Sequence, residues 1–72
     1  MPQYMILREE IERIHIRNEG KFVRPADVFN GIVDAYLSTS AEADTVRFSF
    51  SGVQIKAEKQ SPETVKFEVE KW

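Results

Sequence analysis

Few side chains in this sequence are suited to chemistry, and the single histidine, His15, comes first among them. Imidazole is the side chain that most often exchanges protons near neutral pH, but a catalytic imidazole needs a nucleophile and an orienting carboxylate beside it. The chain has no cysteine, so it has neither a thiolate nucleophile nor a thiolate metal ligand. We interpret His15 as a surface histidine on a helix flank or a strand, and we expect no catalytic residue.

Four carboxylates are the remaining candidates for a catalytic or metal site. Asp27 and Asp34 are seven residues apart, so a helix would present them on one side, about 10 Å apart along its axis. Carboxylates that hydrolyse sugars must flank the substrate in a cleft, which a chain of 72 residues rarely contains. Glu42 and Asp44 could offer oxygen ligands to a hard cation, but the calcium-loop pattern is absent and the three glycines stand alone. We therefore expect no enzyme, no metal site and no bound cofactor.

The same carboxylates are better candidates for a protein-docking surface. The net charge is −2, yet residues 25–45 contain four acids and no Lys or Arg. Such a block favours a basic partner over a polyanion. We expect a non-enzymatic protein-interaction module, such as a small inhibitor, adaptor or accessory subunit, that acts by surface complementarity. Its candidate partner-binding residues are Asp27, Asp34, Glu42, Asp44 and Trp72.

Apolar residues outside the main hydrophobic pattern add to the case for docking. They are Ile6, Ile16, Phe22, Val23 and Trp72. Exposed apolar patches often mark interfaces, although Phe22 and Val23 could instead close the core where two helices meet. The last strand of the chain would also be a sheet edge that can accept another strand. A homodimer through these surfaces is left open.

Nucleic-acid regulation is the alternative function, with phosphate contacts from the basic residues that precede the acidic block. Those residues are Arg13, Arg17, Lys21 and Arg24. Residues 25–38 occupy the position of a recognition helix but contain no Lys or Arg, which argues against this alternative. The phenylalanines of the C-terminal half alternate with polar residues, and this pattern turns them towards a protein core rather than towards bases.

Residues 3–17 are predicted to form a helix, because apolar residues recur there at spacings of three and four. These residues are Tyr4, Leu7, Ile11 and Ile14. The end of the segment has a second interpretation. Because Ile16 continues an alternation of apolar and polar residues, residues 14–23 could instead form a β-hairpin.

Residues 25–38 are predicted to form a second helix. Pro25 suits the first helical position, and Asp27 in the first turn complements the helix dipole. Apolar pairs then repeat every four residues through the rest of the segment. Asn30-Gly31 is also a hairpin-turn signal, but the repeat continues through it. We therefore expect Gly31 inside the helix, where it permits close approach by another backbone.

From Thr45 onward the hydrophobic period changes to two, which predicts three strands, each with one apolar and one polar face. The inward-facing residues are Val46, Phe48 and Phe50 in the first strand, Val53, Ile55 and Ala57 in the second, and Val65, Phe67 and Val69 in the third. Ser51-Gly52 forms the first turn, and residues 60–63 form the second.

Charge favours one register for the second hairpin, in which Lys56 lies opposite Glu68 and Glu58 lies opposite Lys66. The first hairpin has two possible registers. A tight two-residue turn sets Arg47 against Lys56, whereas a four-residue loop sets Arg47 against Glu58. Both registers keep the apolar face intact, because a shift of two residues does not exchange the faces of a strand.

The predicted fold class is α+β, with two helices packed on one face of a three-stranded antiparallel β-meander in the order α-α-β-β-β. The length predicts one small domain over residues 1–72. The first seven residues are largely apolar but too few for a signal peptide or a membrane span. We therefore expect no membrane contact and a cytoplasmic location.

Overall fold

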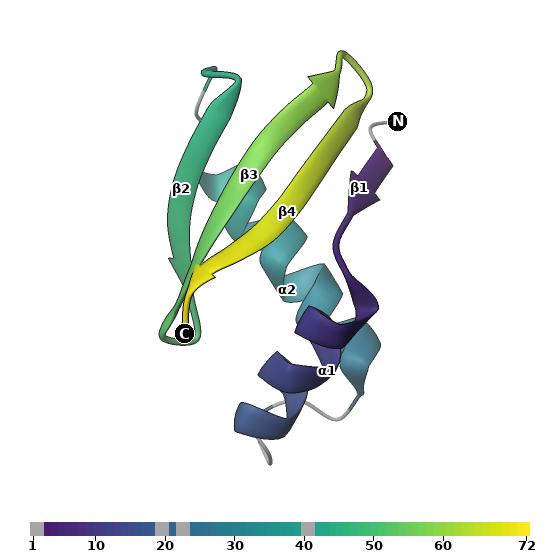
Figure 1. Ribbon diagram of the computed structural model, residues 1–72, viewed down its shortest axis with the longest axis vertical. Coiled ribbons are helices and arrows are strands. Elements are labelled where there is room, and N and C mark those ends of the chain that lie inside the picture. Colours follow the sequence, from purple (N-terminus) through teal and green to yellow (C-terminus); the bar gives the residue numbers. More distant parts are fainter. Residues whose placement is uncertain (1–2, 19–20, 22–23, 40–41) are drawn as a thin grey trace.

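The computed structural model describes residues 3–18, 21, 24–39 and 42–72, and it places two helices against one face of a four-stranded sheet (Figure 1). The predicted α+β class and the two helices are confirmed. In chain order the elements are β1 (Gln3–Met5), α1 (Arg8–Arg17), α2 (Pro25–Ser38), β2 (Thr45–Phe50), β3 (Val53–Ser61) and β4 (Thr64–Lys71). The sheet is mixed, with strand order β1-β4-β3-β2, so the purely antiparallel three-stranded meander is wrong in this detail.

The strand β1 is where the structure departs from the helix predicted over residues 3–17. Tyr4 pairs with Val65 in a parallel register, and its ring stacks on Phe67 with 5.8 Å between the centroids. Because Tyr4 pairs with β4 in the sheet, the chain is extended there and α1 begins only at Arg8. Leu7 is the exposed N-cap of the helix. Pairing with a distant strand outweighs the local helical spacing in so short an apolar segment.

The helix α1 extends to Arg17, which confirms the helical interpretation as far as that residue. Ile14 is fully buried, whereas Ile16 is 72% exposed. The carbonyl of Ile14 accepts two hydrogen bonds from Asn18, one from its backbone N–H at 3.1 Å and one from its side-chain amide at 2.9 Å, which closes the last turn of α1. The predicted roles of Phe22 and Val23, in a hairpin or in closing the core, lie outside the described residues.

The helix α2 begins as predicted, with Pro25 in its first turn and Asp27 at its N-terminus. Gly31 lies inside the helix at a point of close contact with β2. A Cβ atom at this position would lie 2.7 Å from the Cζ atom of Phe50. The missing side chain therefore makes room for an aromatic ring, and not for the backbone expected from the sequence.

Both hairpins of the sheet are tight. Ala57 pairs with Phe67, which confirms the register predicted from charge for β3 and β4. In the first hairpin, Phe50 pairs with Val53 across the two-residue turn, so Arg47 lies opposite Lys56. This turn uses positive φ angles at Ser51 (50°) and Gly52 (79°), as the turn type that matches strand twist requires.

The core fills the space between the helices and the apolar face of the sheet. Phe67 is its largest fully buried side chain, and the rings of Tyr4, Tyr36 and Phe48 pack around it. The buried residues are Ile14, Val28, Ile32, Val53, Ile55, Ala57, Val65 and Phe67. Phe48 and Phe50 are half-buried against this cluster, so the aromatic residues of β2 face the protein core, as predicted.

Candidate functional site

The acidic residues predicted for partner binding lie along α2 and before β2, at places that do not form a single cluster. Asp27 stands at the start of α2, where its Oδ2 atom accepts a hydrogen bond from the backbone N–H of Arg24 at 3.1 Å. Its Oδ1 atom lies 3.6 Å from the guanidinium of the same arginine. The carboxylate of Asp27 thus serves the N-terminus of the helix, where orphan donors and the helix dipole favour it.

Asp34, Glu42 and Asp44 are all exposed. Asp34 is on the second half of α2, and the other two precede β2 at the end of the chain connection from α2. The backbone carbonyl of Asp44 accepts a hydrogen bond from the N–H of Lys59 at 2.8 Å, which attaches this segment to β3. These three side chains are the part of the predicted acidic surface that faces solvent.

The contact between Gly31 and Phe50 shows which flank of α2 faces the β2 side of the sheet. A helix turns about 100° per residue, so Asp27 and Asp34 lie within about 60° of Gly31 around the helix axis. Leu37 lies about 120° from Gly31 in the same rotational direction, about 60° beyond Asp34, on the solvent side of the helix. The two acidic residues of α2 therefore lie between the flank that meets β2 and the solvent side of the helix, and we call Asp27, Asp34, Glu42 and Asp44 the acidic border of β2.

Trp72 contacts α1 through its ring. Its ring is half-buried against the core, and the guanidinium carbon of Arg13 lies 4.3 Å from the ring centroid. One turn earlier on the same helix, the Oε2 atom of Glu10 accepts a hydrogen bond from the Val69 N–H at 3.0 Å. These contacts join the end of β4 to α1.

The four basic residues proposed for phosphate contact are divided between structural contacts and solvent. Arg13 stacks on Trp72, and Arg24 pairs with Asp27. Arg17 is exposed in the last turn of α1, and the Nζ atom of Lys21 lies 3.4 Å from the Ser51 hydroxyl. Three members of the predicted set, Arg13, Lys21 and Arg24, thus have partners within the fold.

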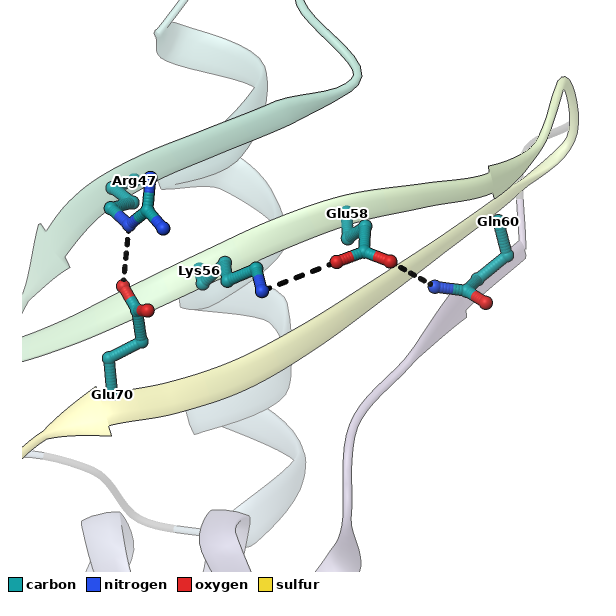
Figure 2. A network of polar contacts seen from close by, with 5 residues as sticks. All are labelled: Arg47, Lys56, Glu58, Gln60 and Glu70. Atoms are coloured by element: carbon teal, nitrogen blue, oxygen red, sulfur yellow. Dashed lines mark hydrogen bonds and ion pairs between the residues drawn. The ribbon is translucent and has the colours of Figure 1, made fainter.

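The face of the sheet that the helices leave uncovered, here called the open face, carries charged residues that pair with one another (Figure 2). The guanidinium of Arg47 reaches across β3 to the carboxylate of Glu70, with an N–O distance of 2.9 Å. Lys56 turns along its own strand to Glu58 at 3.3 Å, and Glu58 also accepts a hydrogen bond from Gln60 at 3.1 Å. These pairings draw Arg47 and Lys56 towards different carboxylates, which explains how the tight register tolerates two opposed cations.

The outer edge of β2 is a part of the sheet that the sequence pattern alone did not indicate as a binding edge. In the described part of the chain β2 pairs only with β3, and it forms the left border of the sheet in Figure 1. The Lys59–Asp44 hydrogen bond flanks the Thr45–Glu58 pair, which makes that pair non-hydrogen-bonded. The hydrogen-bonded and non-hydrogen-bonded pairs alternate along an antiparallel ladder. The backbone N–H and C=O groups of Thr45, Arg47 and Ser49 therefore point away from β3.

The expected free edge on the last strand is wrong for the first half of β4. Residues 64–66 pair with β1, so β4 lies inside the sheet there. At the opposite border of the sheet β1 has only three residues, whereas β2 has six. The sequence could have indicated the free edge of β2, because the first strand of a three-stranded meander is an edge strand just as the last one is.

Two hollows lie on the described surface. One of about 80 Å³ lies on the open face and is lined by Lys56, Glu58, Gln60, Lys66 and Glu68. Another lies beside Asp44, Lys59, Ser61 and Pro62. Over the same described residues, no group of three or more His, Cys, Asp or Glu side chains could hold a metal ion.

Neither described helix is both long and apolar enough to cross a membrane. Comparison of the chain with protein families, with curated proteins and with solved structures yields no match.

Proposed function

We propose that this protein is a non-enzymatic protein-interaction module that binds its partner by adding an extended strand of the partner to β2. The observation that carries the proposal is the outward direction of the backbone groups at Thr45, Arg47 and Ser49. A row of such groups on an edge strand is a template for another strand. The main-chain hydrogen bonds supply affinity, and the neighbouring side chains supply selectivity.

The side chains of β2 support this role. Edge strands are commonly protected by a charged side chain, and the only charged residue in β2 is Arg47. Its guanidinium is drawn inward to Glu70, away from the edge. On the helix side of the same strand, Val46, Phe48 and Phe50 are half-buried. A strand added beside them would cover more of their apolar surface and remove it from water.

The test uses peptides selected from a random display library against the folded protein. We expect the selected peptides to change the amide NMR signals of Thr45, Arg47 and Ser49. Ser49→Pro should abolish binding, because proline removes one outward N–H, while the fold persists since an outward position on an edge strand tolerates proline. Ser49→Thr keeps the N–H and is the matched control. Binding that maps to the open face or to α1, or that survives Ser49→Pro in a folded variant, would contradict the proposal.

The alternative of a nucleic-acid-associated regulator is supported by the exposure of Arg17, Lys21 and Arg24 around the connection between the two helices. It expects retarded mobility of an RNA or DNA probe, with an affinity that falls steeply as salt increases. Arg17→Gln should weaken that binding and reduce its salt dependence. A probe that migrates unchanged at low salt would leave the protein-interaction module as the function.

A further inference from the structure

We infer that the strand added to β2 comes from a basic segment of a partner protein, with Lys or Arg at alternate positions on the side of the sheet that the helices cover. This inference rests on the proposed function and names the chemistry of the partner. It follows from the side chains that an added strand would meet on each side of the sheet.

An added strand continues the pleat of the sheet, so its successive side chains point alternately to the helix side and to the open face. On the helix side they lie beside Val46, Phe48 and Phe50, which are half-buried. Lys and Arg suit such a position, because their aliphatic stems cover apolar surface while their charged ends reach outward.

The charge around this edge favours the basic side chains. The acidic border of β2 supplies Asp34 from the near flank of α2, together with Glu42 and Asp44 from the segment before the strand. Asp27, on the same flank, is partly neutralised by Arg24. Lys59 lies beside Asp44, lines the same hollow and offsets part of its charge, so Asp34 and Glu42 supply most of the negative charge at this edge. Complementary charge of this kind selects partners and speeds their association.

The open face restricts the side chains of the partner strand less than the helix side does. There the added strand would lie beside Thr45, Arg47 and Ser49, of which only Arg47 is charged. The carboxylate of Glu70 already pairs with that guanidinium. We therefore expect polar, uncharged residues such as Thr or Ser at the intervening positions of the partner strand.

A second copy of this chain fits the edge less well. A two-fold axis perpendicular to the sheet would join two β2 strands antiparallel and keep both helical layers on one side. Two identical acidic flanks of α2 would then lie on the same side of the joined sheet, where like charges repel. The basic segment of another protein has no such conflict.

The experiment compares two synthetic peptides of about eight residues, a length that covers β2. One alternates Lys with Thr and Ser so that every Lys lies on one face, and the other has Glu in place of each Lys. Fluorescence anisotropy gives the affinities, and amide NMR signals locate the binding. We expect the Lys peptide to bind at β2 at least about tenfold more tightly than the Glu peptide, with the difference shrinking as salt rises.

Charge-removing variants test the acidic border directly. Asp34→Asn should lower the affinity for the Lys peptide by about threefold, in line with the small energies of exposed ion pairs. The combined variant D34N/E42Q/D44N should lower this affinity by about tenfold or more. The control Glu63→Gln removes one exposed charge from the turn between β3 and β4 and should leave the affinity unchanged.

The outcomes distinguish the inferred basic partner from the proposed function, which is binding by strand addition to β2. If the Glu peptide binds at β2 as tightly as the Lys peptide, strand addition stands and the basic partner is wrong. If neither peptide changes the amide signals of β2, strand addition itself is contradicted. A concentration-dependent dimer with protected β2 amides would identify a second copy as the occupant and overturn the basic partner.

Discussion

The turn between β2 and β3 depends on two residues with left-handed backbone conformation. Gly52 adopts its φ of 79° without a steric penalty, and its missing Cβ has no neighbour within 4 Å. Ser51 adopts a φ of 50° with a side chain present, which costs an ordinary residue about 1–2 kcal/mol. Its hydroxyl lies 3.4 Å from Lys21 Nζ, an exposed contact that contributes little.

We therefore expect Ser51→Asn to stabilise the fold by about 0.5–1 kcal/mol, because asparagine tolerates the left-handed region better than serine does. Urea denaturation measures the change. Gly52→Ala is the opposing control, and it should destabilise by about 1 kcal/mol through the backbone alone, since the space around the new Cβ is open. Equal stability of the three proteins would show that this turn carries no strain.

Gly31 is the residue where helix propensity and packing oppose each other. Alanine in its place favours the helix by about 1 kcal/mol, but its Cβ would lie 2.7 Å from the Phe50 ring, and overpacking costs about 1–3 kcal/mol. We expect Gly31→Ala to destabilise by about 1 kcal/mol on balance. In a Phe50→Leu background the same change should become stabilising, and a double-mutant cycle measures this coupling.

Among the elements, α1 is joined to the end of β4 by polar contacts as well as by burial. The carboxylate of Glu10 accepts a hydrogen bond from Val69 N–H, beyond the residues of β4 that β1 covers. Glu10→Ala should cost about 1–3 kcal/mol, because it removes the acceptor of a partly buried donor. Hydrogen exchange at the Val69 amide should accelerate in that variant. Glu10→Gln keeps an acceptor oxygen and should preserve most of the protection.

The pairing of β2 with β3 sets Arg47 against Lys56, so the strand pair relies on Glu70 to hold the guanidinium elsewhere. Glu70→Gln should destabilise by about 0.2–1 kcal/mol, the range of exposed ion pairs. The loss should shrink at high salt, because these side chains are open to solvent. Glu63→Gln, in the turn between β3 and β4, is the control of equal charge. A loss that does not depend on salt would mean that Glu70 acts through packing instead.

The elements that the sequence predicts well are those with long, unbroken periods. Helix 25–38 repeats every four residues and the C-terminal strands alternate without interruption, so both are found with the register expected from Lys56 and Glu58. The segment of β1 has only three residues, and nothing within it distinguishes the first turn of a helix from a strand. Its conformation depends on Phe67, more than sixty residues away, which local periodicity does not reveal.

The sequence predicts which acidic residues belong to the candidate site, but it does not predict which strand edge lies beside them. The acidic block of residues 25–45 is visible in the sequence, whereas the edge beside it depends on which strands are neighbours. The position of Trp72 off the main hydrophobic pattern predicts a docking role, and in the structure Arg13 covers one side of its ring. Arg24 and Asp27, chosen for opposite functions, pair with each other at the start of α2. Contacts between side chains of this kind follow from the fold and not from spacing.

At the scale of the whole molecule, Tyr4 connects the layers. Its ring stacks on Phe67 of β4 and meets the ring of Tyr36 from α2 edge-on at 6.2 Å. Because Tyr4 is half-buried, Tyr4→Ala should cost about 2 kcal/mol, less than the loss of a fully buried aromatic side chain. Tyr4→Phe keeps both ring contacts and should stay within about 0.5 kcal/mol of the parent protein. Thermal denaturation of the two variants distinguishes ring packing from the hydroxyl.

The parallel pairing of β1 with β4 also has a consequence for synthesis on the ribosome. The segment of β1 is translated early, but the strand that receives it emerges only after α1, α2, β2 and β3. Until then Tyr4 has no Phe67 to stack on, and bringing such distant segments together is slow because loop closure must come first. A nascent chain stalled before residue 64 should therefore leave the segment of β1 open to proteases, and translation through β4 should protect it.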